Sequence, residues 1–432
     1  MKSQKINQFV VDNYDNNSNK SFVAGKTYIR PSGKVFDHKE VSNIIESAFD
    51  GWFTSGRFNK EFETKLSGFL GIKHLLTTNS GSSSNLLAFS ALTSDMHGER
   101  ALKKGDEVIS VAAGFPTTVN PIIQNGCIPV FVDICLKTLN IDVNLIEQSI
   151  TENTKAIFLA HTLGNPFNLH KIIEICRKYN LWLIEDNCDA LGSKYNGQYT
   201  GTFGNVGTLS FYPAHHITMG EGGAIFTNDS TLKKVIESFR DWGRDCYCEP
   251  GMDNTCKKRF EWQLGDLPFG YDHKYTYSHM GYNLKITDMQ AALGLAQLEK
   301  LDSFISARKH NFHLLRERLK IAEEFLFIAE PTDNSAPSWF GFPITLRDEA
   351  PFNRVDLLAY LEQNKIGSRL IFAGNLTKQP YMKKIKYRIA SELKNTDIVM
   401  NNSFWIGLYP GINEEMIDYM ADKILTFLGL KF

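Results

Sequence analysis

Three polar segments of the sequence carry residue types that could hold a phosphorylated ring and move a proton on it. Residues 78–84 read TNSGSSS directly before the apolar helical pattern NLLAFSAL. Hydroxyls and backbone N–H groups at a helix start can cradle a phosphate, although they also form ordinary helix caps. Glu185 and Asp186 end the apolar run LWLI, where a carboxylate could hold a protonated ring nitrogen or simply close a strand. The third segment, SFYPAHHIT at 210–218, offers His215, whose imidazole is a base near neutral pH.

Four of the seven cysteines follow the spacing C-x57-C-x-C-x7-C, namely Cys188, Cys246, Cys248 and Cys256. The last three lie in a turn-rich segment, DCYCEPGMDNTC, that could fold over a metal. Thiolates at this density in a reducing compartment suggest zinc or an iron–sulfur centre, and spacing alone does not separate the two.

Cys188 lies two residues beyond Asp186, so a metal centre there would sit within about 7 Å of backbone from the carboxylate, a suitable place for an electron donor. The other three cysteines fall on separate elements and are expected in the core: Cys127, Cys135 and Cys176.

The elements that must position these residues alternate between short strands and helices. We expect two helices within 37–71, followed by strands at 107–111, 128–134, 156–160 and 181–184 with helical patterns between them. TLSFYP and GAIFTN add two more strands before the helix TLKKVIESFRDWG. This alternation predicts an α/β fold with a mostly parallel sheet, whose ligands bind at the carboxyl ends of the strands.

The chain, at 432 residues, exceeds the usual size of a single hydrophobic core. We expect an N-terminal segment at 1–36, a large cofactor-binding domain at 37–320 and a small C-terminal α+β domain at 321–432. The long helical pattern from 285 to 320, read as one helix or two, marks the join.

Composition is that of an ordinary globular protein, with 43% hydrophobic residues, 22% charged residues and a formal net charge of −1. Nothing in it indicates a nucleic-acid partner. The N-terminus lacks a signal-peptide core, and no stretch approaches the ~20 apolar residues of a membrane span. The sequence therefore predicts a cytoplasmic protein with no membrane association.

In order and spacing, the three polar segments resemble motifs of the sugar aminotransferases with the aspartate aminotransferase fold, fold type I of pyridoxal phosphate (PLP) enzymes. A fourth motif, GYNLKITDMQAA at 281–292, agrees, and the resemblance runs from about Tyr28 to the C-terminus. It implies that Phe115 stacks on the cofactor ring and Asp186 holds the ring nitrogen. It further implies that Asn283 reaches the phosphate of a neighbouring subunit in a homodimer with shared sites. The implied ligands of the cofactor phosphate are Gly81, Ser82 and Ser210.

The chain departs from this family beside the cofactor. His215 stands at the position of the Schiff-base lysine, Asp189 replaces a His or Gln, and Tyr212 replaces a His. Because imidazole cannot form the covalent imine, ordinary amino transfer is disfavoured. In having histidine at the lysine position, the chain resembles one branch of the family, the 3-dehydrases of nucleotide-linked 4-keto-6-deoxy sugars. These enzymes use pyridoxamine phosphate (PMP) to remove a C3 hydroxyl. A degenerate, inactive homologue is the alternative, but the phosphate and ring-nitrogen motifs are intact.

The cysteine spacing resembles that of the dehydrases acting on CDP-4-keto-6-deoxyglucose. This likeness implies a 2Fe-2S cluster, an NADH-dependent flavin and iron–sulfur reductase as partner, and a product that feeds 3,6-dideoxyhexose synthesis for the O-antigen of lipopolysaccharide. Related dehydrases acting on TDP-sugars leave the nucleotide open. Cations for the diphosphate, which could equally be solvated surface charges, are Arg244, Lys274 and Arg369.

Two alternatives remain open at this point. A reductase-independent 3-dehydratase, like the enzyme acting on GDP-4-keto-6-deoxymannose, would share the histidine without needing the four cysteines. A non-catalytic protein that binds the cofactor or a nucleotide sugar would instead use the cysteines to hold structural zinc.

Overall fold

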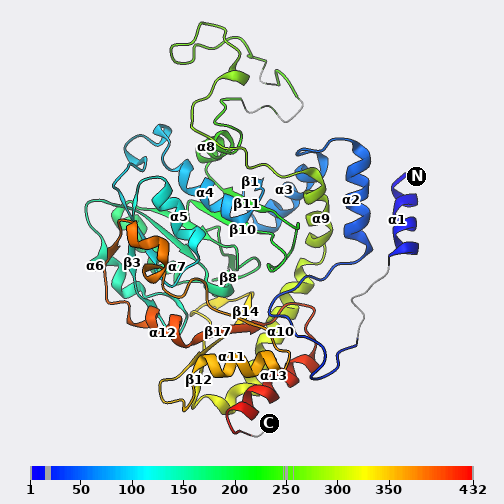
Figure 1. Ribbon diagram of the computed structural model, residues 1–432. Coiled ribbons are helices and arrows are strands. Elements are labelled where there is room, and N and C mark those ends of the chain that lie inside the picture. The colour runs from blue at the N-terminus through cyan, green and yellow to red at the C-terminus, as the bar shows by residue number, and fades with distance from the viewer. Residues whose placement is uncertain (1, 15–20, 247, 249–251, 256, 431–432) are drawn as a thin grey trace.

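The computed structural model describes residues 2–14, 21–246, 248, 252–255 and 257–430. Its central element is an eight-stranded sheet with the strand order β1-β11-β10-β7-β6-β2-β3-β16 (Figure 1). Only β11 runs antiparallel to its neighbours in this sheet, which confirms the mostly parallel sheet expected from the sequence. The bounds of these strands are β1 His74–Thr78, β2 Glu107–Val111, β3 Ile128–Val132, β6 Thr154–Ala160, β7 Trp182–Asp186, β10 Val206–Ser210, β11 Gly223–Thr227 and β16 Arg388–Ile389.

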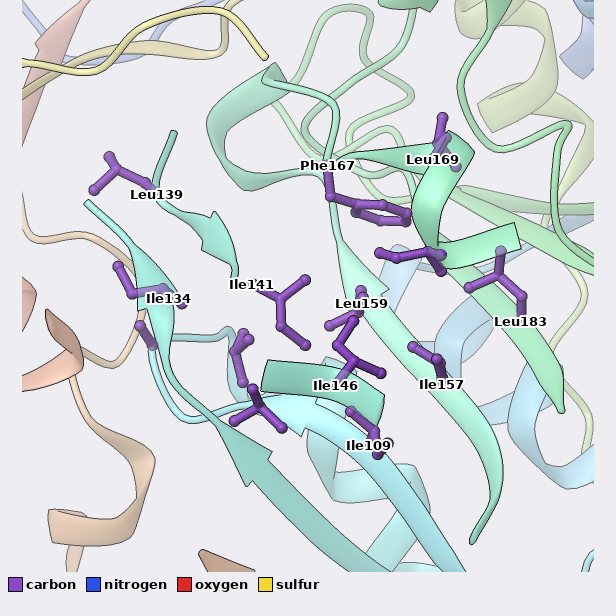
Figure 2. Close-up of a cluster of buried hydrophobic side chains, with 14 of the residues drawn as sticks. Ile109, Ile134, Leu139, Ile141, Ile146, Ile157, Leu159, Phe167, Leu169 and Leu183 are labelled. Atoms are coloured by element: carbon purple, nitrogen blue, oxygen red, sulfur yellow. The ribbon is translucent and has the colours of Figure 1, made fainter. Parts of the chain in front are cut away.

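Helices cover both faces of the sheet because neighbouring residues on a strand point to opposite sides. On β7, Leu183 belongs to one buried apolar cluster and Ile184 to another, and Ile157 and Phe158 divide in the same way on β6. Figure 2 shows the first of these clusters, in which Leu183 and Ile157 lie beside residues from helix α7 and the β3–β6 connection. The helices between the strands are α4 Gly81–Ala91, α5 Pro116–Gln124, α6 Ile146–Ser149, α7 Leu169–Tyr179 and α8 Ser230–Arg240.

A smaller antiparallel sheet, β12-β14-β17-β15, lies at the C-terminal end of the molecule with its own buried cluster (Figure 1). The helical pattern at 285–320 forms two helices, and the second spans both cores: Phe304 packs in the large part and Phe312 in the small one. The boundary at residue 320 stays a prediction. The bounds here are α9 Asp288–Leu298, α10 Leu301–Leu319, β12 Leu326–Ile328, β14 Gly341–Leu346, α11 Arg354–Gln363, β15 Ser368–Arg369, α12 Lys394–Asn402, β17 Ser403–Gly407 and α13 Glu414–Phe427.

The C-terminal part also returns to the large sheet. Strand β16 pairs in parallel with β3, placing Arg388 opposite Val130. The Arg388 guanidinium donates hydrogen bonds of 2.7 and 2.6 Å to the Glu107 carboxylate on β2. A two-residue strand and one ion pair therefore fix the C-terminal segment to the sheet edge.

Three N-terminal helices lie along one side of the sheet, and the described residues between α8 and α9 project above the body in Figure 1. No described helix is long and apolar enough to cross a membrane. The remaining elements are α1 Lys2–Asn13, α2 His38–Asp50, α3 Arg57–Leu70, the hairpin β4 Ile134–Cys135 with β5 Asn140–Ile141, and a small sheet of β13 Ser335–Ala336, β8 Lys194–Tyr195 and β9 Gln198–Tyr199.

Candidate active site

A cavity of about 600 Å³ lies where β7 and β10 end and helix α4 begins. Its wall collects nine of the predicted cofactor-binding, catalytic and metal-ligating residues, from four separate stretches of chain, which is the arrangement expected at the carboxyl ends of parallel strands. Their roles toward a cofactor remain predictions. These nine are Gly81, Ser82, Phe115, Asp186, Cys188, Asp189, Ser210, Tyr212 and His215.

The first turn of α4 faces the end of β10. Ser80 caps the helix by accepting the Ser83 N–H at 3.0 Å. A Cβ at Gly81 would lie 2.4 Å from the Ser210 Cβ, so only glycine allows the helix start to approach this strand so closely. The positive end of the helix dipole and the Ser82 and Ser210 hydroxyls thus converge, which suits a phosphate group.

Asp186, the last residue of β7, is a buried carboxylate with three hydrogen-bond donors. Its Oδ2 accepts from Asn85 Nδ2 at 2.8 Å and from Thr118 Oγ1 at 2.7 Å, and its Oδ1 accepts from the Cys188 N–H at 3.2 Å. Three donors on its two oxygens fix the orientation of this carboxyl group. The carboxylate is therefore prepared to bind a protonated ring nitrogen.

Sequence reasoning missed Asn85 and Thr118, which orient this carboxylate. Asn85 itself is fixed by Thr208 on β10, whose hydroxyl donates to the amide oxygen at 2.7 Å. The signal for Asn85 was its position one helical turn after Gly81, on the same face of α4. Nothing in the pattern distinguished Thr118 from an ordinary residue of a helix start.

His215 lies beside Asp189 with 3.4 Å between its Nδ1 and the carboxyl Oδ1, a contact without hydrogen-bond geometry. Burial lowers the pKa of His215 to about 3, and the Arg308 charge adds to this effect. Burial likewise raises the pKa of Asp189 to about 8, helped by the nearby Asp186 charge. At neutral pH the imidazole is accordingly uncharged and can accept a proton.

His216, the second histidine of the pair, faces another way. Its Nε2 lies 2.8 Å from the Ser338 carbonyl oxygen, and it does not line the cavity. The geometry thus separates the two imidazoles that the sequence places side by side.

Two aromatic rings of the cavity wall present free surface to its interior. Phe115 stands at the N-cap of α5, is 46% exposed and meets Phe372 edge-to-face at 6.1 Å. Tyr212 is 53% exposed. Such exposed rings suit a planar ligand, because stacking would bury them.

The structure places the cysteines predicted to bind a metal at two different sites. Cys246 and Cys248 come together with His273, all three ligand atoms within 4.8 Å of one another, which suits zinc or iron. Cys188 is not part of this group and lines the main cavity instead, while Cys256 lies outside the described residues. Sequence reasoning missed His273 because it stands 25 residues beyond Cys248 in no recognisable ligand spacing.

The three cysteines expected in the core differ in how deeply they are buried. Burial raises the pKa of both Cys127 and Cys176 to about 12, as befits core thiols, whereas Cys135 on β4 is partly exposed.

Of the three cations proposed for a diphosphate, only Arg369 lines the cavity. Lys274 pairs with Asp253, and the Arg244 guanidinium stacks 4.4 Å from the centre of the Trp242 ring. Asn283 also lies off the cavity wall, where it accepts a hydrogen bond from Lys285 at 2.7 Å. Its reach toward a neighbouring subunit stays a prediction.

A phosphorylated pyridine fits the residues of this cavity. The N-terminus of α4 suits its phosphate, the oriented carboxyl of Asp186 suits its ring nitrogen, and the exposed ring of Phe115 suits its flat face. Among the described residues that line the cavity there is no lysine, so the site holds no amine for a covalent imine.

Comparisons with known proteins identify the family of this chain. The family model of the DegT/DnrJ/EryC1/StrS aminotransferases matches residues 34–425. Lipopolysaccharide biosynthesis protein RfbH of Salmonella typhimurium is 62% identical, covering 99% of this chain and 98% of that protein. The dTDP-4-dehydro-2,6-dideoxy-D-glucose 3-dehydratase of Saccharopolyspora spinosa is 53% identical, covering 95% and 88%.

Among solved structures, GDP-4-keto-6-deoxymannose-3-dehydratase with a trapped PLP-glutamate geminal diamine superimposes with a TM-score of 0.82. It is 30% identical and covers 92% of this chain and 100% of its own. The chain therefore has the fold type I of PLP enzymes and belongs to the DegT/DnrJ/EryC1/StrS aminotransferase family.

Proposed function

We propose that this protein is a PMP-dependent 3-dehydrase that removes the C3 hydroxyl of a nucleotide-linked 4-keto-6-deoxyhexose. The observation that carries the proposal is the absence of the lysine that binds the cofactor covalently in aminotransferases. His215 lines the cavity, and no described lysine does. A transaminase needs the lysine to hold its cofactor and to shuttle protons, whereas a dehydrase needs only a base at this place.

The cavity residues divide the work of holding the cofactor. Gly81, Ser82 and Ser210 bind its phosphate, and Phe115 stacks on its ring. Asp186 keeps the ring nitrogen protonated. A bound PMP would supply an amine for the C4 ketone of the sugar and a ring that accepts an electron pair.

His215 is the base of the reaction. Its neutral imidazole accepts the proton from the carbon that bears the cofactor amine, and the C3 hydroxyl leaves as water after protonation. Asp189 lies beside the Nδ1 of His215, where a positive charge on the imidazole favours ionisation of its carboxyl, and the resulting carboxylate balances that charge. Tyr212, at the mouth of the cavity, bounds the space for the sugar.

Removal of the hydroxyl leaves the sugar two electrons short of the 3-deoxy product. Two electrons and two protons enter for each water that leaves, so a reductant is required. We propose a 2Fe-2S centre held by Cys188, Cys246, Cys248 and Cys256, which would pass electrons singly, and a partner reductase that contains flavin and iron–sulfur centres and oxidises NADH. The grouping of Cys246 and Cys248 supports a metal centre, and His273 competes with Cys188 as a ligand.

The proposed substrate is CDP-4-keto-6-deoxyglucose, with Arg369 contacting the diphosphate at the cavity mouth. Likeness to RfbH supports a place in lipopolysaccharide synthesis, and we propose that the protein acts in the cytoplasm. The named substrate of the Saccharopolyspora relative is linked to dTDP, so both nucleotides belong in the assay. We further propose a homodimer in which Asn283 of each chain reaches the other chain's cofactor phosphate.

The test is chemical. Borohydride treatment of protein loaded with pyridoxal phosphate, followed by peptide mapping, should leave every lysine unmodified, and dialysis should remove the cofactor. A phosphopyridoxyl group on any lysine would contradict the proposal. The substrate class is tested by incubating PMP-loaded protein with the CDP- and dTDP-linked sugars in oxygen-labelled water, which should place label at C3 of one of them.

A reductase-independent 3-dehydratase is the second candidate, favoured by the 30% identity and TM-score of 0.82 to GDP-4-keto-6-deoxymannose-3-dehydratase. The two differ in iron content. Protein purified without oxygen should be brown and hold about two irons per chain under our proposal. Colourless protein that forms a 3-deoxy sugar without reductase, with the two electrons coming from PMP as it becomes PLP and an amino donor such as glutamate restoring PMP, would establish the second candidate instead.

A further inference from the structure

Arg308 on α10 is a buried cation directly behind the candidate site. Its side chain is 1% exposed and is among the largest fully buried side chains of the described chain. No described carboxylate forms an ion pair with it; its guanidinium is surrounded by backbone carbonyls. Because a buried charge is costly unless its donors are used, this placement calls for an explanation.

The carbonyls that Arg308 contacts belong to two distant segments. Nη1 donates to Trp339 O at 3.2 Å and to Phe340 O at 2.9 Å, and Nη2 donates to His215 O at 3.4 Å. One segment is the turn after β10, and the other leads into β14 of the small sheet. A single planar guanidinium therefore joins the backbone of the catalytic turn to the facing wall of the cavity.

The same two segments also meet inside the cavity. The His215 and Phe340 rings both line it, with centroids 5.2 Å apart. The His215 Nδ1 is buried and has no hydrogen bond, since Asp189 stands slightly too far away at 3.4 Å. The direction of this imidazole therefore depends on its own backbone and on the neighbouring Phe340, both of whose carbonyls Arg308 contacts, and on a hydrogen bond with the Cys188 backbone.

We infer that Arg308 is a positioning residue for proton transfer by His215, with its guanidinium fixing the His215 and Phe340 backbones relative to each other. This rests on the proposed function, in which His215 is the base. The step at stake breaks a C–H bond at the amine-bearing carbon of the cofactor, moves the proton to an imidazole nitrogen and leaves the electron pair in the ring. No oxidant or reductant takes part in it.

The test compares Arg308→Met and Arg308→Lys with the wild-type protein. Two quantities are measured: the affinity for PMP by spectral titration, and the washout of tritium from the amine-bearing carbon of bound PMP after the sugar is added. Because Arg308 touches no residue of the proposed phosphate or ring-nitrogen site, Arg308→Met should change PMP affinity by less than about threefold. It should slow washout by about 100-fold, the cost of a misplacement near 1 Å.

Arg308→Lys should recover part of this loss. The ammonium keeps the charge but cannot contact three carbonyls with a planar fork, so washout should be slowed about tenfold. This graded recovery separates positioning from simple loss of stability. It also supplies the readout if Arg308→Met does not fold.

Arg354→Met is the matched control. The Arg354 guanidinium also donates to two backbone carbonyls, those of Met400 and Ser403 at 2.7 and 3.0 Å, but neither of these residues lines the cavity. It should lower the melting temperature and leave the washout rate unchanged.

Two results would overturn the inference: washout at the wild-type rate in folded Arg308→Met or Arg308→Lys, or an equal slowing in Arg354→Met. A wild-type protein that binds PMP and shows no washout, or shows the same washout after His215→Asn, would instead count against the proposed function. The two failures are therefore distinguishable.

Discussion

Asn85 on α4 donates a 2.8 Å hydrogen bond to Asp186 at the end of β7. The helix whose first turn faces the proposed phosphate site thus also orients the proposed partner of the ring nitrogen. One rigid element sets the spacing between the two ends of the expected cofactor.

This relationship predicts the effect of Asn85→Ala. Loss of one hydrogen bond to a carboxylate corresponds to about 1.5 kcal/mol, so PMP affinity should fall about tenfold. Spectral titration measures the change. Asn120→Ala serves as control, because it removes an amide that accepts a hydrogen bond from Tyr381 and does not line the cavity. Equal affinities in the two variants would mean that Asp186 keeps its orientation without Asn85.

His215→Asn should abolish proton removal from the cofactor and leave PMP affinity within about threefold, because the proposed phosphate and ring contacts belong to other residues. Solvent exchange at the amine-bearing carbon is the direct assay. His216→Asn is the comparison, since that ring faces Ser338 rather than the cavity. Exchange that survives the first substitution and disappears in the second would reverse the roles of the two histidines.

Asp189→Asn should slow this exchange by about 10- to 100-fold, because the Asp189 carboxyl can ionise beside the protonated imidazole and balance its charge, whereas an amide cannot. PMP affinity and the melting temperature are measured alongside. An exchange rate equal to that of wild type would remove Asp189 from the reaction.

Under the proposed function, Cys248→Ala should lose iron and stop product formation while sparing reversible dehydration, because the residues proposed for dehydration, Asp186, Asp189 and His215, do not include Cys248. Oxygen label from water at C3 of the substrate reports dehydration, and circular dichroism verifies folding. Loss of both activities in folded protein would mean that the metal centre also shapes the dehydration site.

The fourth ligand is identified by a parallel pair of variants. We expect Cys188→Ser to lose iron and His273→Asn to keep it, measured as iron per chain and by the visible spectrum. The opposite result would assign the ligand role to His273, in line with the grouping of His273 with Cys246 and Cys248.

The ion pair between Glu107 and Arg388 predicts a pH dependence of stability. Hydrogen bonds from Arg388 hold the pKa of Glu107 below its usual range. The pair therefore stabilises the fold above the ordinary carboxyl pKa, and this contribution is lost as pH falls through the lowered value. Arg388→Met should lower the free energy of unfolding by about 2 kcal/mol at pH 7, with the difference from wild type shrinking in acid.

Denaturant unfolding at pH 7 and at about pH 3 measures this difference. Lys378→Met breaks an exposed pair with Asp397, whose side chains are 48% and 41% exposed, and should cost less than about 1 kcal/mol. A difference for Arg388→Met that stays constant down to low pH would show that Glu107 does not contribute through its charge.

Sequence periodicity predicted most of the large sheet because its strands are short apolar runs buried on both faces. β2 begins and ends where the pattern placed it. β7 begins one residue later than expected and includes Glu185 and Asp186, so the carboxylate ends the strand rather than following it. Ladder pairing with β6 decides this, since Asp186 pairs with Ala160.

The site residues that the sequence missed are those whose partners come from other elements. Arg308 looked like an ordinary polar residue of an amphipathic helix, and only the tertiary structure shows three carbonyls around it. His273 reaches Cys246 and Cys248 across a loop whose path no periodicity defines. Motifs find residues that contact a ligand, but they do not find the residues that support them.

The pairing of β16 with β3 bears on how the protein is made. During synthesis, β3 offers one unpaired edge from the time it pairs with β2 until residue 389 has left the ribosome, more than 250 residues later. The unpaired backbone N–H and C=O groups at the edge of an apolar strand can pair with strands of other nascent chains. The two residues of β16 thus act as a late closing strand, and a chain released before residue 388 would leave that edge open.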